Sequence, residues 1–248
     1  MRRFFFHSNQ RQDDLVTLDS EESHHISKVL RLKKGEKVEL CEGKGLVYLA
    51  EIVMTGKSVQ LRIVEELGKG QHEQHSRAGL FVGQGAIKIK KMELVIQKCT
   101  ELGVDGFYPY VGKRSQGNVV QQYRGKGERW RRIVAEACKQ SLRSSSLEVH
   151  EIISFDEMIS LMDKEEGVLK LLLWEKERQT TFTSFSRQLG QNSTVILLLG
   201  PEGGFTHEEV AEARARGWQT VGLGERILRA ETAAIAAVAI VQHHRGDM

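Results

Sequence analysis

The sequence has few cysteines and no long apolar run, and each absence excludes a class of protein. Only three cysteines occur in 248 residues, and Cys41, Cys99 and Cys138 are widely spaced among apolar neighbours. An odd number in such settings indicates reduced thiols in a core, which argues against a disulfide framework and against metal ligation. No uninterrupted apolar stretch reaches the length of a membrane-spanning helix.

A targeting segment is also missing. Residues 1–7 carry the positive charge of a signal peptide, but their apolar region is far too short and no small-residue cleavage site follows. The apolar fraction of 40% and the charged fraction of 28% are typical of a soluble globular protein. We therefore expect a cytoplasmic protein.

Several motifs of nucleotide and nucleophilic chemistry are absent or incomplete. No Gly-Lys-Ser or Gly-Lys-Thr follows a glycine loop, which excludes a P-loop, and Ser and Cys nucleophile motifs are lacking. Gly83 and Gly85 follow a predicted strand, but Lys88 stands where a dinucleotide fingerprint needs its third glycine. A nucleotide-dependent oxidoreductase using this loop stays open as an alternative. His72 and His75 have no third ligand nearby, so we interpret them as part of a solvated linker and expect no metal.

Positive charge is present in modest excess and is clustered. The 36 Lys and Arg against 33 Asp and Glu give a formal net charge of +3. Such clusters are most often solvated faces, but five in one chain favour a polyanionic partner, most plausibly RNA. The clusters are residues 2–3, 28–37, 88–91, 113–114 and 124–132.

The pattern of apolar residues changes near residue 70. Residues 1–66 contain five short stretches of β-forming residues with glycines between them and one helical pattern at 20–30, which predicts a small β-barrel. Residues 65–77 are polar, as in a linker. Beyond them strands and helices alternate, which predicts a mostly parallel sheet covered on both faces. We expect domains at 1–70 and 78–248, joined by a linker at 71–77.

The most informative stretch is a glycine loop after a buried strand. The apolar run 195–199 stops at Gly200-Pro201-Glu202-Gly203-Gly204, and Thr206 with Glu209 forms a capping box that begins a helix. Three glycines leave main-chain N–H groups open to a ligand. Because ligands of parallel sheets bind at the carboxyl ends of strands, the loops 174–177 and 223–229 are expected beside this one. The helix that follows, from Ala230, is apolar nearly all round, so it is either buried or packed against a second copy.

The chain resembles a known family in the order and spacing of these segments. The matching segments are Lys91-Met92-Glu93, Gln97-Lys98, residues 100–104, Glu136-Ala137-Cys138, Gln140, Arg143, residues 200–204, Leu223-Gly224, Ile227-Leu228-Arg229 and Glu231-Thr232-Ala233, together with residues 25–35. Their combination is similar to the RsmE-type ribosomal RNA methyltransferases of the SPOUT class and covers essentially the whole chain. Two differences are the sequence Ser144-Ser145-Ser146, where the family usually has a proline, and an extension at residues 85–89.

This resemblance implies both a fold and an activity. The fold implied is an α/β SPOUT domain with a C-terminal trefoil knot, preceded by a PUA-like β-barrel that docks RNA. The activity implied is transfer of a methyl group from S-adenosyl-L-methionine to N3 of one uridine, U1498, of 16S rRNA in the 30S subunit, by a homodimer. A catalytically silent RNA-binding protein is a further alternative.

Specific residues follow from the strand-end loops and this chemistry. We expect Arg229 to stabilise the uracil anion and Glu231 to accept the N3 proton; alternatively, the two pair with each other and only cap the last helix. The expected cofactor-binding residues are Leu173, Trp174, Leu199, Gly200, Pro201, Glu202, Gly203, Gly204, Leu223, Gly224, Ile227, Leu228 and Thr232. The expected RNA contacts are Arg2, Arg3, Arg31, Lys33, Lys34, Lys91, Arg114 and Arg143.

Overall fold

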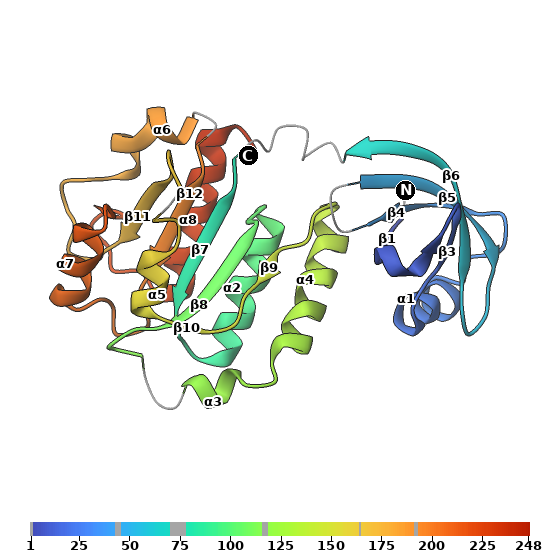
Figure 1. Cartoon of the computed structure of the whole chain (residues 1–248), viewed down its shortest axis with the longest axis horizontal. Helices are drawn as coiled ribbons and strands as arrows, with labels where there is room; N and C mark the ends of the chain where they lie inside the picture. Colours follow the sequence, from blue (N-terminus) through green and yellow to red (C-terminus); the bar gives the residue numbers. More distant parts are fainter. Residues whose placement is uncertain (1, 43–45, 70–77, 116–118, 164, 191–192) are drawn as a thin grey trace. The chain divides into compact units, whose positions relative to one another are not determined.

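The computed structural model describes residues 2–42, 46–69, 78–115, 119–163, 165–190 and 193–248. The expected linker at 71–77, with His72 and His75, lies outside the described residues. The chain divides into two compact units, one of Met1–His75 with Cys138–Ser146 and one of Ser76–Ala137 with Leu147–Met248. We describe each unit by itself (Figure 1).

The first unit is built on a six-stranded sheet with the order β1-β4-β5-β6-β3-β2. Neighbouring strands are antiparallel except β1 and β4, which are parallel. The elements are β1 (Arg3–Phe5), a 3-10 turn (Ser8–Gln10), β2 (Arg11–Gln12), β3 (Leu15–Thr17), α1 (Ser20–His24), a π-helical turn (His25–Val29), β4 (Lys37–Cys41), β5 (Leu46–Met54) and β6 (Gln60–Lys69). The strand and helix patterns of the sequence are confirmed here.

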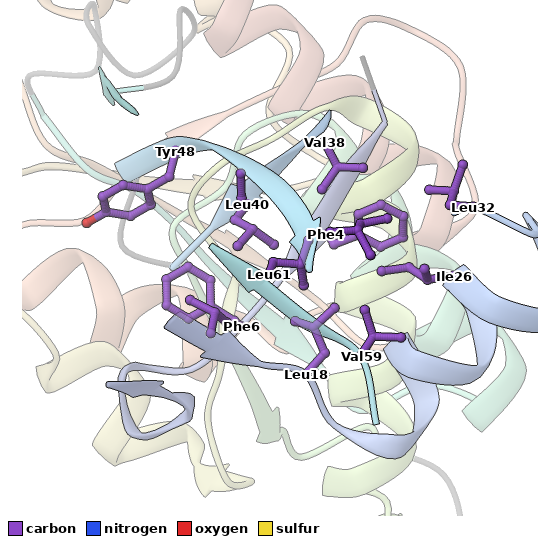
Figure 2. Packing of buried hydrophobic residues seen from close by; sticks show 13 residues of the cluster. Phe4, Phe6, Leu18, Ile26, Leu32, Val38, Leu40, Tyr48, Val59 and Leu61 are labelled. Carbon is purple, nitrogen blue, oxygen red and sulfur yellow. The ribbon is translucent and has the colours of Figure 1, made fainter. Parts of the chain in front are cut away.

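Alternating apolar residues of these strands form the core of the first unit. Phe4 and Phe6 of the N-terminal segment pack with Leu40 and Leu61, and all four are at most 2% exposed (Figure 2). Ile26, from the π-helical turn, belongs to the same cluster and is fully buried. The helical segment is therefore held to the sheet by the apolar side chains at its C-terminal end.

The second unit is a mixed α/β fold on a parallel seven-stranded sheet with the order β10-β8-β7-β12-β11-β13, and β9 pairs with β8. The elements are β7 (Leu80–Gly85), α2 (Ile89–Glu101), β8 (Gly106–Val111), α3 (Val119–Tyr123), α4 (Gly127–Ser141), β9 (Glu148–Val149), β10 (Ile153–Ser154), α5 (Phe155–Ser160), β11 (Leu169–Leu173), a 3-10 turn (Phe182–Phe185), α6 (Ser186–Gly190), β12 (Val195–Leu199), α7 (His207–Ala215), β13 (Gln219–Val221) and α8 (Ala230–Arg245). The predicted alternation of strands and helices is confirmed.

The capping box expected at Thr206 is confirmed in atomic detail. Thr206 Oγ1 accepts from the main-chain N–H of Glu209 at 3.2 Å, and Glu209 Oε2 accepts from the N–H of Thr206 at 2.8 Å. Ser154 and Glu157 do the same at the start of α5. These caps fix where the loops before the helices end.

The structure argues against a nucleotide-dependent oxidoreductase that would use Gly83 and Gly85 as a binding loop. Both glycines lie inside strand β7 and are buried, so they do not form a phosphate-binding turn. A Cβ on Gly83 would lie 2.6 Å from Met158 Sδ, and one on Gly85 would lie 2.5 Å from the main-chain N of Pro201. Close packing of the strand explains the glycines.

The short strand β13 is bordered on both sides by one stretch of chain. On one side it pairs with β11, and Trp174 N–H donates to Val221 O at 3.1 Å. On the other side Gly222 N–H donates to Thr180 O at 2.9 Å, and Thr181 forms a parallel bridge with Gly222. The segment after β11 therefore returns along the outer edge of β13.

The last helix, α8, packs against α2, α6 and β12. Ala234, Ala237, Val238 and Val241 are fully buried, whereas Ile235 and its neighbours on another face are half-buried. None of the helices in the described ranges has the length and apolarity needed to cross a membrane.

Candidate functional site

A cavity of about 420 Å³ opens at the carboxyl ends of β11, β12 and β13. The three loops expected to converge there do so, which confirms that parallel pairing brings these strand ends to one edge. The residues lining it are Lys91, Leu173, Trp174, Glu175, Leu199, Gly200, Pro201, Glu202, Gly203, Gly204, Phe205, Val221, Leu223, Gly224, Arg226, Ile227, Leu228, Arg229, Ala230 and Ala233.

Twelve of the thirteen residues expected to bind a cofactor line this cavity. The exception is Thr232, which is exposed and lies outside the lining. On this turn of α8 Ala230 and Ala233 line the cavity, and the helical rotation between successive residues turns the side chain of Thr232 away from it.

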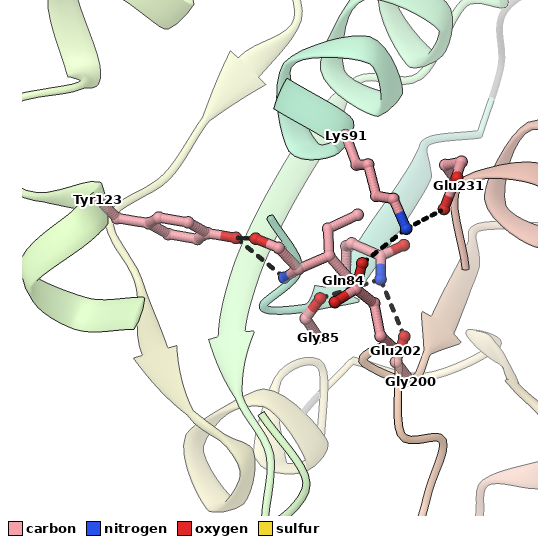
Figure 3. A network of polar contacts seen from close by, with 8 residues as sticks. Gln84, Gly85, Lys91, Tyr123, Gly200, Glu202 and Glu231 are labelled. Carbon is pink, nitrogen blue, oxygen red and sulfur yellow. Dashed lines mark hydrogen bonds and ion pairs between the residues drawn. The ribbon is translucent and has the colours of Figure 1, made fainter. Parts of the chain in front are cut away.

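The glycine loop is held at its first residue by the strand next to it. Gln84 Nε2 donates to Gly200 O at 3.0 Å (Figure 3). Tyr110 Oη, from β8, donates to Leu199 O at 2.8 Å at the end of β12. Further along, Gly204 takes a φ of +68°, which favours glycine, and its N–H donates to Pro201 O at 2.9 Å. The loop thus turns back on itself and presents main chain to the cavity.

The cavity wall from β11 ends in Trp174. The indole stands edge-on to His207 with the ring centroids 5.4 Å apart, and the guanidinium of Arg214 lies 5.7 Å from its centroid. The Nε1 of Trp174 is buried and has no hydrogen-bond partner in the described part of the chain. Such a donor is usually satisfied by a water or a ligand.

Lys91 links the glycine loop to the last helix. Its Nζ lies 2.6 Å from Glu202 Oε1 and 3.5 Å from Glu231 Oε2, so the ammonium points between the two carboxylates (Figure 3). The three side chains are 32%, 19% and 12% exposed, respectively. Hydrogen bonding to Glu202 and the charges of both carboxylates raise the pKa of Lys91, so it stays a cation at neutral pH.

Of the two residues expected to act on the substrate, Arg229 lines the cavity and Glu231 does not, although its carboxylate lies beside Lys91, which does. Arg229 is the N-cap residue of α8, is exposed, and lines the cavity. Within the described residues its guanidinium makes no hydrogen bond or ion pair, and Glu231 pairs with Lys91 instead. The alternative that Arg229 and Glu231 only pair with each other is therefore not the arrangement found.

The expected RNA-contact residues fall into two groups. Arg2, Arg31, Lys33 and Lys34 are exposed on the first unit, and Arg31 takes a φ of +52°. The other four are engaged with the protein: Arg3 pairs with Glu39 at 2.8 Å, Lys91 lies in the cavity, Arg114 donates to Gly203 O at 3.0 Å, and Arg143 is buried and donates to Ser145 Oγ at 3.2 Å.

Some lining residues were not expected from the sequence. Lys91 was expected to contact RNA and not to line this cavity, although its position at the start of α2, two residues into the helix, gave a signal that it could reach a strand end. Glu175 lies close to the glycine loop, because a Cβ on Gly204 would be 3.3 Å from its carboxylate oxygens. Arg226 and Ala233 flank residues that were expected.

Among the described residues no group of three or more His, Cys, Asp and Glu side chains is placed to hold a metal ion.

Comparisons with known proteins agree with this arrangement. A family model described as an RNA methyltransferase domain matches residues 74–242, and one described as an RNA methyltransferase PUA domain matches residues 18–64. The ribosomal RNA small subunit methyltransferase E of Bacillus subtilis is 30% identical over the full length of both chains. The Synechocystis protein of the same name is 33% identical over 90% of this chain and 71% of its own.

Solved structures give the same result. The Neisseria gonorrhoeae ribosomal RNA small subunit methyltransferase E, bound to S-adenosyl methionine, superposes with a TM-score of 0.84 at 29% identity and covers 98% of this chain and 97% of its own. A Legionella pneumophila putative methyltransferase in complex with its cofactor has a TM-score of 0.83 at 30% identity and covers 97% of this chain and 96% of its own.

The α/β fold, the glycine-loop cavity and the matched domains define an RNA methyltransferase with an attached PUA domain. Within that class, the chain belongs to the ribosomal RNA small subunit methyltransferase E family.

Proposed function

We propose that the protein transfers a methyl group from S-adenosyl-L-methionine to N3 of a single uridine, U1498, of 16S rRNA in the 30S subunit, in the cytoplasm. The observation that carries this is the cavity at the ends of β11, β12 and β13, where exposed main chain meets Arg229, which makes no hydrogen bond or ion pair within the described residues. The family, whose members are named for small-subunit ribosomal RNA, supports the choice of substrate.

The residues of the cavity fit this cofactor. A Cβ on Gly200 would lie 3.2 Å from the ring of Phe205, and one on Gly203 would lie 3.0 Å from Arg114 Cβ. On the side that faces the protein, these two positions therefore have room for main chain but not for a side chain. Leu173, Trp174 and Leu228 supply apolar surface for an adenine, and the buried Trp174 Nε1 is a donor that still lacks an acceptor. When bound, S-adenosyl-L-methionine supplies an electrophilic methyl group.

The protein's own residues have two tasks toward the uracil. Its N3 must lose a proton, and the negative charge that develops on the ring oxygens must be stabilised. Arg229, which lines the cavity and makes no hydrogen bond or ion pair within the described residues, is placed to donate hydrogen bonds to those oxygens. Glu231 accepts the proton, and the Lys91 ammonium, 3.5 Å from its Oε2, orients the carboxylate. Positioning of the reactants contributes roughly 7–11 kcal/mol at best, so the anion also needs this electrostatic help.

The test of Arg229 uses two variants of the same loop. Arg229→Ala should leave the affinity for S-adenosyl-L-methionine within about twofold and lower single-turnover methylation by about 10²- to 10³-fold, the usual loss when one anion-stabilising donor is removed. Arg226→Ala, which removes an equal charge from the same loop, is the control and should keep most of the rate. Near-normal turnover of Arg229→Ala would remove the residue from the mechanism.

We further propose that α8 closes a trefoil knot and that two copies form a homodimer. The passage of β13 between β11 and residues 180–181 supports a threaded chain. The apolar, half-buried face of α8, which carries Ile235, Ala236, Ala239 and Ile240, supports a second copy as its cover. Light scattering after gel filtration checks the dimer, and a mass of one chain would contradict it.

The first unit, residues 1–70 in our assignment, is proposed to dock the RNA. Its exposed Arg2, Arg31, Lys33 and Lys34 suit phosphate contacts.

The alternative of a silent RNA-binding protein predicts no binding of S-adenosyl-L-methionine in calorimetry. An oxidoreductase predicts binding of NAD, which the strand conformation of Gly83 and Gly85 opposes.

A further inference from the structure

A second cavity, of about 430 Å³, lies in the second unit and shares no lining residue with the first. Its walls are residues 123–131, which lead from the end of α3 into α4, and residues 149–152, which join β9 to β10. β9 and β10 both pair with β8, whereas the first cavity lies at the ends of β11, β12 and β13. The two cavities therefore belong to different parts of the same sheet.

Aromatic rings form much of this second cavity. Tyr123 and Trp130 are buried and stand edge-on to one another, with the ring centroids 5.2 Å apart. His150 stacks flat on Tyr108, with the centroids 4.0 Å apart and the planes within 4°. The His150 side chain is 30% exposed and lines the cavity, so a further flat ring can extend the stack.

The edge of the cavity is basic. Residues 124–132 contain five Lys and Arg and one acid, Glu128. Arg129 forms an ion pair with Glu93 on α2, whereas Arg124 and Arg131 are exposed and line the cavity. Arg131 also contacts Glu128 at the surface, where such a pair is weak and yields to a stronger anion.

Polar groups of both kinds complete the lining. Glu151 brings a carboxylate, and the buried Nε1 of Trp130 has no acceptor in the described part of the chain. Stacked rings, cations at the rim and a few donors and acceptors are the means by which proteins hold unpaired nucleotides. An acidic peptide would use the cations and leave the stacking surface unused.

We propose that this cavity binds one unpaired nucleotide of the substrate RNA, with its base stacked on His150 and its phosphates on Arg124 and Arg131. The proposal rests on the proposed function, because it takes the substrate to be RNA. The site adds a contact for the RNA outside the cofactor cavity.

Hydrogen bonds join the cavity to the segment that leads into α2. Tyr123 Oη donates to Ile87 O at 2.7 Å and accepts from Ile87 N–H at 3.0 Å (Figure 3). Ile87 lies in the short segment between β7 and α2, and Lys91 is in the first turn of α2. An RNA held in the cavity is thereby placed at a fixed position relative to Lys91 and the glycine loop.

The experiment measures binding of isolated 30S subunits by His150→Ala and Arg131→Ala. Loss of the stacking surface should weaken binding about 5- to 150-fold, the range for one stacked base. His150→Phe keeps a flat ring and should restore binding to within about threefold of wild type. Arg132→Ala, which removes the neighbouring exposed arginine that does not line the cavity, is the matched control for Arg131→Ala. Calorimetry with S-adenosyl-L-methionine should give wild-type affinity for all four variants.

A measurement on the unaltered protein guards against variants that fail to fold. Ultraviolet crosslinking to 30S subunits carrying 5-bromouridine, followed by peptide mass spectrometry, should label peptides that contain residues 123–131 or 149–152. Wild-type affinity of His150→Ala and Arg131→Ala, or crosslinks confined to other peptides, would overturn the proposal. So would an equal loss of poly-aspartate binding with no rescue by His150→Phe, which would identify an acidic peptide as the occupant. If the wild-type protein binds and crosslinks as expected but transfers no methyl group, the proposed function fails and the cavity assignment stands.

Discussion

Gly85 is the residue at which strand β7 touches the glycine loop. A Cβ there would lie 2.5 Å from the main-chain N of Pro201 and 2.6 Å from its Cδ, and neither group belongs to a flexible side chain. Gly85→Ala should therefore push the loop away from Gln84 and lower the free energy of unfolding by about 1–3 kcal/mol. Binding of S-adenosyl-L-methionine should weaken with it.

Thermal unfolding and calorimetry check this prediction. Gly127→Ala is the matched control, because a Cβ at Gly127 would meet nothing nearer than the Arg131 guanidinium at 3.9 Å. If Gly85→Ala binds the cofactor as well as Gly127→Ala does, contact between β7 and Pro201 does not hold the loop.

Lys91 gives a second prediction at the scale of one residue. Lys91→Met leaves the carboxylates of Glu202 and Glu231 facing each other without the cation between them. Repulsion between the two carboxylates, no longer offset by the ammonium, should move Glu231 out of position and lower the single-turnover methylation rate at neutral pH. Lys91→Arg should restore most of the wild-type rate.

The control for this charge is Lys88→Met, which removes an exposed lysine just before α2. It should leave the methylation rate unchanged. A Lys91→Met rate equal to that of wild type would show that the ammonium does not act on Glu231.

At the scale of elements, Glu177 fastens the segment after β11 around β13. Its Oε2 accepts from Thr220 Oγ1 at 2.7 Å, and its Oε1 accepts from the N–H groups of Gln179 and Thr180 at 3.0 and 3.1 Å. These bonds, with the Thr220 hydroxyl first and Arg214 adding its charge, lower the pKa of Glu177 below its ordinary 4.5. The side chain thereby holds the loop that carries Trp174.

Glu177→Gln should lower the free energy of unfolding at pH 7 by about 1 kcal/mol, the usual value of one hydrogen bond. Because the folded-state pKa is depressed, this contribution is present above pH 4.5 and is lost as the pH falls through the lowered value. Urea unfolding at pH 7 and below pH 4.5 should show the gap between wild type and variant closing. Glu166→Gln, an exposed site, is the control, and a gap that is the same at both pH values would contradict the account.

The sequence predicts most elements because their signals are local. Alternating apolar residues, capping pairs such as Thr206 and Glu209, and the stop at Gly200 each act over a few residues. Strand β2, with two residues, is too short to show a pattern, and the stretch 148–153 divides into β9 and β10 because residues between them leave the ladder.

Only part of the candidate site could likewise be predicted from the sequence. Strand ends of a parallel sheet meet at one edge, so the loops of the first cavity could be predicted without coordinates. The role of Lys91 could not, because its partner Glu202 is 111 residues away and the position of α2, which packs against α8, is set by tertiary contacts. The second cavity also escaped prediction, since Tyr108 lies in β8 and His150 directly follows β9, and the two rings stack only because of how these strands pair.

At the scale of the whole molecule, two units present cations for one polyanionic substrate. Binding of RNA should therefore weaken steeply as salt rises, with log K falling in proportion to log salt. Replacing both Lys33 and Lys34 by Ala should lower affinity about equally for all RNA sequences and reduce that slope by about 1.4–1.8, because each phosphate contact releases bound counterions. Fluorescence anisotropy over a salt series measures this, and a slope equal to wild type would exclude these lysines from the interface.

The measurement that tests the central claim most directly is methylation of isolated 30S subunits with methyl-labelled S-adenosyl-L-methionine, followed by mass spectrometry of the digested 16S rRNA. We predict one labelled methyl group per subunit, on N3 of U1498, and almost none with Arg229→Ala. Label on another base or another atom, or no label in subunits that the protein demonstrably binds, would contradict the account.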